Sequence, residues 1–193
     1  MNSCSNHNTL SFGHRGAKGY LAENTFESIS KAIELGVDGI EIDVFKCLSG
    51  DLVLFHDKDL KDLTGKSGQI ENLTINELEE FLVLEKFKIP TLNDVLMKIE
   101  SPLFVNIELK GSNTAGATSK IITDFSRRTS WTQNNFIVSS FNWNELEKFR
   151  SVDNNTPVGV LVSKSISINE AIEFGKKITN IPKDFKVHKT LQK

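Results

Sequence analysis

The stretch GIEIDVF, residues 39–45, alternates apolar and acidic side chains over the length of one β-strand. Successive side chains of a strand point to opposite faces, so Glu41 and Asp43 share one face and Ile42 lies on the other. Two carboxylates directed into a covered space are costly unless they pair with cations or bind a metal ion. This stretch therefore predicts a strand in a covered sheet, with a site for cations or a metal ion on one face of that sheet.

Short apolar segments alternate with helical patterns along the rest of the chain. We expect strands at 10–12, 39–45, 51–56, 103–109, 136–140 and 158–162, with a weaker seventh at 178–181, and helices at 25–35, 74–81, 91–99, 117–128, 144–150 and 169–176. Residues 58–72 are expected to form a polar loop. Strands that alternate with helices are typical of a parallel sheet with crossover helices.

Two α/β architectures fit this order, an open doubly wound sheet and a closed barrel. An open nucleotide-binding sheet usually has a glycine-rich phosphate turn after its first strand, whereas residues 14–16 here are His-Arg-Gly. Polar residues instead follow several successive strands, as in barrel enzymes. We therefore predict a (β/α)8-type TIM barrel that lacks its last strand and helix, because seven strands are counted.

Length and composition predict a single domain spanning residues 1–193. The formal net charge is −2, which does not favour nucleic acid as a partner. No apolar run approaches the roughly 20 residues of a transmembrane helix, and residues 1–9 do not resemble a signal peptide. Cys4 and Cys47 are interpreted as free thiols of a reducing compartment, so we expect a cytoplasmic location.

Ionisable side chains gather at the ends of four predicted strands: His14 and Arg15, Glu41 and Asp43, His56 and Asp57, and Glu108 and Lys110. Three carboxylates form an all-oxygen ligand set that suits Mg²⁺ or Ca²⁺. Arg15 and Lys110 supply positive charge for phosphate oxygens. Two histidines can exchange protons near neutral pH. Together these groups indicate cleavage of a phosphoryl ester rather than sugar or acyl chemistry.

The motifs of the chain, taken in order, resemble those of the glycerophosphodiester phosphodiesterases. They are HRG at 14–16, ENT at 23–25, GIEIDV at 39–44, VLFHD at 53–57, LT at 73–74, IPTL at 89–92, NIELK at 106–110 and SSF at 139–141. The sequence departs from the pattern of this family in two places. Residues 61–64 lack the arginine usual after the third strand, and the family's Trp-Thr-Val-Asn-like segment of the last barrel strand is absent.

The resemblance implies a role for each site residue. Glu41, Asp43 and Glu108 would bind the metal, His14 and His56 would act as general base and general acid, and Arg15 and Lys110 would hold phosphate oxygens. Members of the family often use the glycerol hydroxyl of the substrate as nucleophile, and water then opens a cyclic phosphate. The products are glycerol phosphate and an alcohol. The resemblance gives Glu23 and Asn24 supporting rather than chemical roles.

Alternative interpretations remain beside this one. The chain could be a catalytically impaired, truncated relative that binds only metal or phosphodiester. It could also be a metal-dependent isomerase or aldolase in which Lys110 forms a Schiff base. Glu108 and Lys110 could form no more than an internal salt bridge, and Arg15 could pair with one of the acids. An open barrel edge further predicts a homo-oligomer that covers it.

Overall fold

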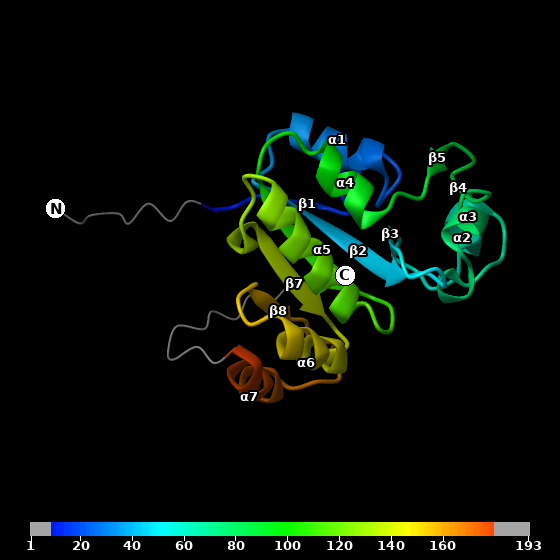
Figure 1. Ribbon diagram of the computed structural model, residues 1–193. Helices are drawn as coiled ribbons and strands as arrows, with labels where there is room; N and C mark the ends of the chain where they lie inside the picture. The colour runs from blue at the N-terminus through cyan, green and yellow to red at the C-terminus, as the bar shows by residue number, and fades with distance from the viewer. Residues whose placement is uncertain (1–8, 180–193) are drawn as a thin grey trace.

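The computed structural model describes residues 9–179, which form an α/β fold around a parallel sheet (Figure 1). Its parallel strands lie in the order β1 (Phe12–His14), β2 (Gly39–Lys46), β6 (Phe104–Leu109), β7 (Phe136–Ser140) and β8 (Val158–Val160). The main helices are α1 (Phe26–Glu34), α4 (Leu92–Lys98), α5 (Ala115–Arg128), α6 (Trp143–Val152) and α7 (Ile168–Thr179). The predicted α/β class and parallel sheet are confirmed.

Side-chain caps fix where several helices begin. The Thr25 hydroxyl accepts a hydrogen bond from the Ser28 amide at the start of α1, and Thr91 does the same for Asp94 at the start of α4. Helix α3 (Ile75–Leu78) begins with a capping box formed by Thr74 and Glu77. Each cap satisfies amides that have no partner within the helix, which stabilises the helix by about 1 kcal/mol.

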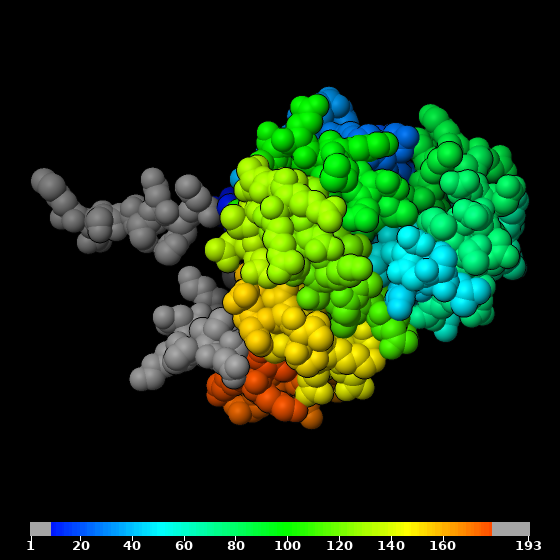
Figure 2. All heavy atoms as spheres, viewed as in Figure 1, coloured from blue at the N-terminus to red at the C-terminus, as the bar shows by residue number. Residues whose placement is uncertain are grey.

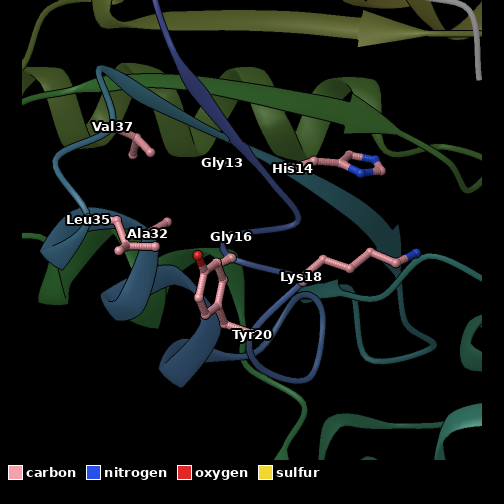
Figure 3. A pocket seen from close by; sticks show the side chains of 10 residues that line it. Gly13, His14, Gly16, Lys18, Tyr20, Ala32, Leu35 and Val37 are labelled. Carbon is pink, nitrogen blue, oxygen red and sulfur yellow. The ribbon is translucent and has the colours of Figure 1, made fainter.

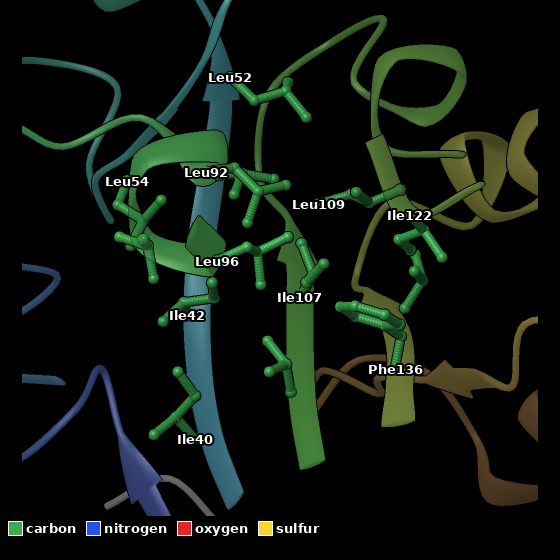
Figure 4. Close-up of a cluster of buried hydrophobic side chains, with 14 of the residues drawn as sticks. Ile40, Ile42, Leu52, Leu54, Leu92, Leu96, Ile107, Leu109, Ile122 and Phe136 are labelled. Carbon is green, nitrogen blue, oxygen red and sulfur yellow. The ribbon is translucent and has the colours of Figure 1, made fainter. Parts of the chain in front are cut away.

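The core lies on one face of the sheet, beneath the helices (Figure 4). Alternate residues of neighbouring strands are fully buried there against α4, α5 and their neighbours: Ile40, Ile42, Ile107, Leu109 and Phe136 with Leu92, Leu96 and Ile122. Burial of each such side chain contributes roughly 1.5–3 kcal/mol. The intervening residues of the same strands, among them Glu41, Asp43 and Glu108, face the other way.

Strand β3 (Leu52–Leu54) differs from the prediction in direction. It is buried as expected, but it pairs antiparallel with β2, with Val44 opposite Leu54 and Lys46 opposite Leu52. Residues 47–51 form a tight turn in which Gly50 has a φ of +101°. A parallel return would need a connection of a dozen or more residues, so the short turn dictates a hairpin.

Residues 58–88 form a separate lobe at the right-hand end of Figures 1 and 2. The predicted loop at 58–72 is wrong in part, since it contains α2 (Lys61–Thr64) and the short 3₁₀ helix η1 (Ile70–Asn72); β4 (Leu82–Val83) and β5 (Phe87–Lys88) form a hairpin beyond α3. A second apolar cluster joins the lobe to β2 and β3, and includes Phe45, Val53, Phe55, Leu60, Ile70, Leu78 and Val83. Elements of two to four residues are too short to show a periodicity in the sequence.

The C-terminal part corrects the predicted number of strands. Ile178 lies in α7, where it is buried together with Ala171, seven residues earlier and on the same helical face. Phe174 of the same helix stacks on Trp143. Residues 180 and 181 of the predicted seventh strand lie outside the described part, as does Cys4. Within residues 9–179 the parallel strands number five rather than seven, and β1 and β8 end their order.

Two smaller findings concern the cysteine and the helices of the described part. Cys47 is buried and forms no disulfide with a described residue. Among residues 9–179, every helix is too short or too polar to cross a bilayer.

Candidate active site

Strand register brings the predicted site residues together on the face opposite the core. His14 lies beside Glu41 in the pairing of β1 with β2, and Asp43 lies beside Glu108 in the pairing of β2 with β6. Parallel strands end at one common edge, where barrel enzymes place their chemistry. His56 arrives by the hairpin instead: β3 runs back along β2, and the Phe55 amide donates to the Asp43 carbonyl at 3.1 Å.

The three carboxylates are crowded and poorly solvated. One oxygen from each of Glu41, Asp43 and Glu108 lies within 4.8 Å of the other two. Burial, reinforced by the charge of Asp43, raises the pKa of Glu41 to about 8. The same two causes raise the pKa of Glu108. Like charges so close together are stable only if protons or a cation neutralise them.

The two oxygens of Asp43 have different surroundings. Its Oδ2 accepts a hydrogen bond from Asn24 Nδ2 at 2.9 Å and lies 3.1 Å from Arg15 Nε, while its backbone amide donates to Asn24 Oδ1 at 3.2 Å. Its buried Oδ1 accepts no hydrogen bond from any described residue. A carboxylate with one anchored oxygen and one buried oxygen without a donor fits a ligand of a hard cation.

Arg15 is held by acids. Its Nη1 lies 2.7 Å from Glu23 Oε1, its Nε faces Asp43, and its side chain is 8% exposed. Its backbone amide donates to Glu41 Oε2 at 3.0 Å, from a φ of +51° that non-glycine residues seldom adopt. Burial would raise the pKa of Glu23, but hydrogen bonds from Lys18 and Arg15 outweigh it and lower that pKa. The geometry thus supports the ion-pair interpretation of Arg15.

His14 lies at the open side of the site. Its Nε2 is 3.7 Å from Glu41 Oε2, and the side chain is 53% exposed. Partial burial and then the charge of Arg15 lower its pKa, so the ring is neutral near pH 7. A neutral imidazole beside the acids can accept a proton.

His56 is held between two charged neighbours. Its Nδ1 lies 2.7 Å from Asp57 Oδ1, and its Nε2 lies 3.1 Å from Lys110 Nζ. A lysine ammonium can only donate, so Nε2 accepts and the proton lies on Nδ1, where it is donated to Asp57. The sequence placed Asp57 at a strand end but did not indicate its contact with His56.

Lys110 completes the cluster. Its Nζ lies 3.1 Å from Glu108 Oε1 and 3.9 Å from Asp43 Oδ1. The internal salt bridge considered from the sequence is therefore present, and it extends to a second acid and to His56. All seven predicted site residues lie in this one cluster or contact it directly. Asn24, Glu23, Asp57 and Lys18 support them through contacts that the sequence does not specify.

Two hollows of about 340 Å³ each adjoin the cluster, within the usual size range of small-molecule sites. One is lined by Glu108, Leu109, Lys110, Phe141 and Asn142. The other follows β1 and α1, and its lining includes His14, Lys18, Tyr20, Ala32, Leu35 and Val37 (Figure 3). In this view His14 and Lys18 extend toward the same side.

The chain is similar to a family of phosphodiesterases. The model of the Glycerophosphoryl diester phosphodiesterase family matches residues 14–175. A glycerophosphodiester phosphodiesterase of Caldanaerobacter subterraneus subsp. tengcongensis is 31% identical over 163 residues, which cover 79% of this chain and 66% of that protein. Among three curated relatives the chain spans 60–66% of their length.

Solved structures support the same similarity. The glycerophosphodiester phosphodiesterase of Thermotoga maritima matches with a TM-score of 0.72 at 33% identity, covering 89% of this chain and 71% of that one. A phosphodiesterase of Oleispira antarctica, solved with the product sn-glycerol-3-phosphate, matches with a TM-score of 0.76 at 27% identity, covering 86% and 71%. These matches support a barrel-type arrangement of the chain.

Proposed function

Because the chain belongs to the glycerophosphoryl diester phosphodiesterase family, we propose that it hydrolyses glycerophosphodiesters with the help of a divalent metal ion. The observation that carries this proposal is the group of three crowded carboxylates with two histidines beside it. The product in the Oleispira relative supports glycerol phosphate as one product here. The other product would be the alcohol of a small diester.

Glu41, Asp43 and Glu108 would hold the metal. Their all-oxygen donor set suits Mg²⁺ or Ca²⁺, and the Oδ1 of Asp43, which accepts no hydrogen bond from a described residue, supports this assignment. When bound, the metal supplies positive charge against phosphoryl oxygens and polarises the ester. Lys110 would add a second cation on the same side. Arg15 would act mainly by orienting Asp43, and its direct phosphate contact stays a prediction.

The two histidines would move the protons. His14 would take the proton of the glycerol hydroxyl, whose oxygen then bonds to phosphorus. The phosphorus–oxygen bond to the alcohol breaks, and the alcohol receives a proton from His56. Water next adds to the cyclic phosphate with the two roles reversed, which gives glycerol phosphate and restores both histidines. Positioned acid–base catalysis of this kind contributes about 10²–10⁴-fold.

The contacts of Lys110 argue against the aldolase interpretation. A Schiff-base lysine needs an amine that is free to attack a carbonyl, whereas Lys110 contacts Glu108, Asp43 and His56. A relative that binds without turnover stays the second candidate, because it would use the same carboxylates. A second copy of the chain that covers the open barrel edge also stays a prediction.

Turnover in histidine variants tests the proposed chemistry. We expect His14→Ala and His56→Ala to lower the release of glycerol phosphate from glycerophosphocholine by about 10²–10⁴-fold. Both side chains are partly exposed, so thermal unfolding should change little. Full activity in either folded variant would remove that histidine from the mechanism. Absence of turnover in a folded, metal-binding wild type would favour the binding-only candidate.

A further inference from the structure

Lys110 lies beside two of the three proposed metal ligands. Its Nζ is 3.1 Å from Glu108 Oε1 and 3.9 Å from Asp43 Oδ1, which is the oxygen that accepts no hydrogen bond from a described residue. The side chain of Lys110 as a whole is 19% exposed. A monovalent cation on a flexible stem therefore already neutralises part of the acidic cluster.

The same nitrogen blocks His56. Lys110 Nζ lies 3.1 Å from His56 Nε2, and that contact requires Nε2 to accept and the ring proton to lie on Nδ1. General acid catalysis by His56 Nε2 needs a proton on that nitrogen. While Lys110 donates to it, His56 cannot present this proton to a leaving alcohol.

We propose that Lys110 is an internal counter-ion that occupies the acidic cluster and masks His56 until the carboxylates bind a divalent cation. Metal binding displaces Lys110 from Glu108 and Asp43, which frees its ammonium for the anion of the substrate and opens Nε2 of His56 to take up from solvent the proton that it later gives to the alcohol. This inference rests on the proposed metal site. It links binding of the metal to the availability of His56 for acid catalysis, although His56 is not itself a proposed metal ligand.

The inference predicts that loss of Lys110 strengthens metal binding. Calorimetric titration of Ca²⁺ and Mg²⁺ should show about tenfold tighter binding to Lys110→Met than to the wild type, because no cation competes for the carboxylates. Lys18→Met is the matched control, since it removes a nearby cation that pairs with Glu23 at 2.6 Å. The control should change the affinity much less than Lys110→Met does.

The outcomes separate this inference from the proposed function. Wild-type binding with unchanged or weaker binding to Lys110→Met would overturn the role of Lys110 and leave the metal site standing. Equal tightening in both variants would show a general charge effect and would also overturn it. A folded wild type that binds neither metal would overturn the metal site, and this inference with it.

Nitrogen NMR of the histidine rings provides a second readout, made on the wild type, that does not depend on the folding of Lys110→Met. The chain has four histidines, so the resonances are few, and His56→Ala identifies those of His56. Without metal, the proton of His56 should lie on Nδ1, and metal addition should shift Nε2 as its donor leaves. An Nε2 signal that metal does not change would contradict the masking.

Discussion

The two faces of the parallel sheet are built from the same strands but carry different side chains, apolar on one face and acidic on the other. On β2 and β6, Ile42 and Ile107 face the helices and are fully buried, whereas their neighbours Asp43 and Glu108 face the other way and are also buried. Burial stabilises the fold on the apolar face and opposes it on the acidic face. The comparison shows that residues that stabilise the core and residues of the candidate site alternate along the same strands, so that each lies next to the other in sequence.

The acidic face should show the largest response to a single change. Glu41→Gln keeps the shape of the side chain but removes one proposed ligand charge, and we expect metal affinity to fall by at least about 100-fold, since even outer partners of a metal site are worth 10–100-fold. Activity should fall with it. Calorimetric titration checks the affinity, with Glu34→Gln on the exposed face of α1 as control. Unchanged affinity would remove Glu41 from the ligand set.

The apolar face should respond in stability alone. Ile107→Ala leaves a cavity in the core, and we expect a loss of about 2–5 kcal/mol in the free energy of unfolding. The exposed Ile33 of α1 is a matched control, and Ile33→Ala should cost far less. Urea denaturation measures both, and metal affinity of the folded variants should stay near that of the wild type. A large drop in affinity for Ile107→Ala would show that the two faces are not independent.

The pH dependence of the stability of the metal-free protein is a third way to distinguish the acidic face from the apolar face, with a smaller expected effect. The pKa of Glu41 in the folded protein, about 8, exceeds its value in the unfolded chain. Its contribution to the free energy of unfolding is therefore present at low pH and is lost as pH rises through 8. The pKa of His14 is lowered, so its effect on stability has the opposite sign. Below its unfolded pKa of 6.5, this effect makes the protein more stable as pH rises. From pH 6.5 to 8 stability should therefore fall by about 1–2 kcal/mol.

Chemical denaturation with EDTA measures this slope. Glu41→Gln should flatten it, and Ca²⁺ should remove most of it because the cation replaces the missing proton. Stability that rises over the same interval would show that the carboxylates are neutralised in some other way.

Strand alternation made part of the site predictable. The i, i+2 spacing placed Glu41 with Asp43 and Glu108 with Lys110 on shared faces, and these placements are confirmed. The path of His56 was not predicted, because the direction of β3 depends on the length of a turn rather than on its apolar pattern. The site residue was found although the strand that delivers it was interpreted wrongly.

Features that depend on contacts in space were beyond the sequence pattern. The hydrogen bond from Asn24 to Asp43 joins residues 19 positions apart, and Thr25 rather than Asn24 caps α1. Ile178 was assigned to a strand because a short apolar run fits a strand or a helix equally well, and packing of α7 decided it. Apart from α3, which lies within the predicted helix at 74–81, the short elements of the 58–88 lobe were not predicted, because they are too short to show a period.

The most direct test of the account is turnover of glycerophosphocholine during titration of the EDTA-stripped protein with Mg²⁺ or Ca²⁺, alongside calorimetric binding to the same sample. The account predicts no release of glycerol phosphate without metal, one ion bound per chain, and activity that rises in step with binding and is lost in Glu41→Gln. Turnover that persists in EDTA, or that is unaffected by loss of Glu41, would contradict a metal-dependent reaction at the three carboxylates.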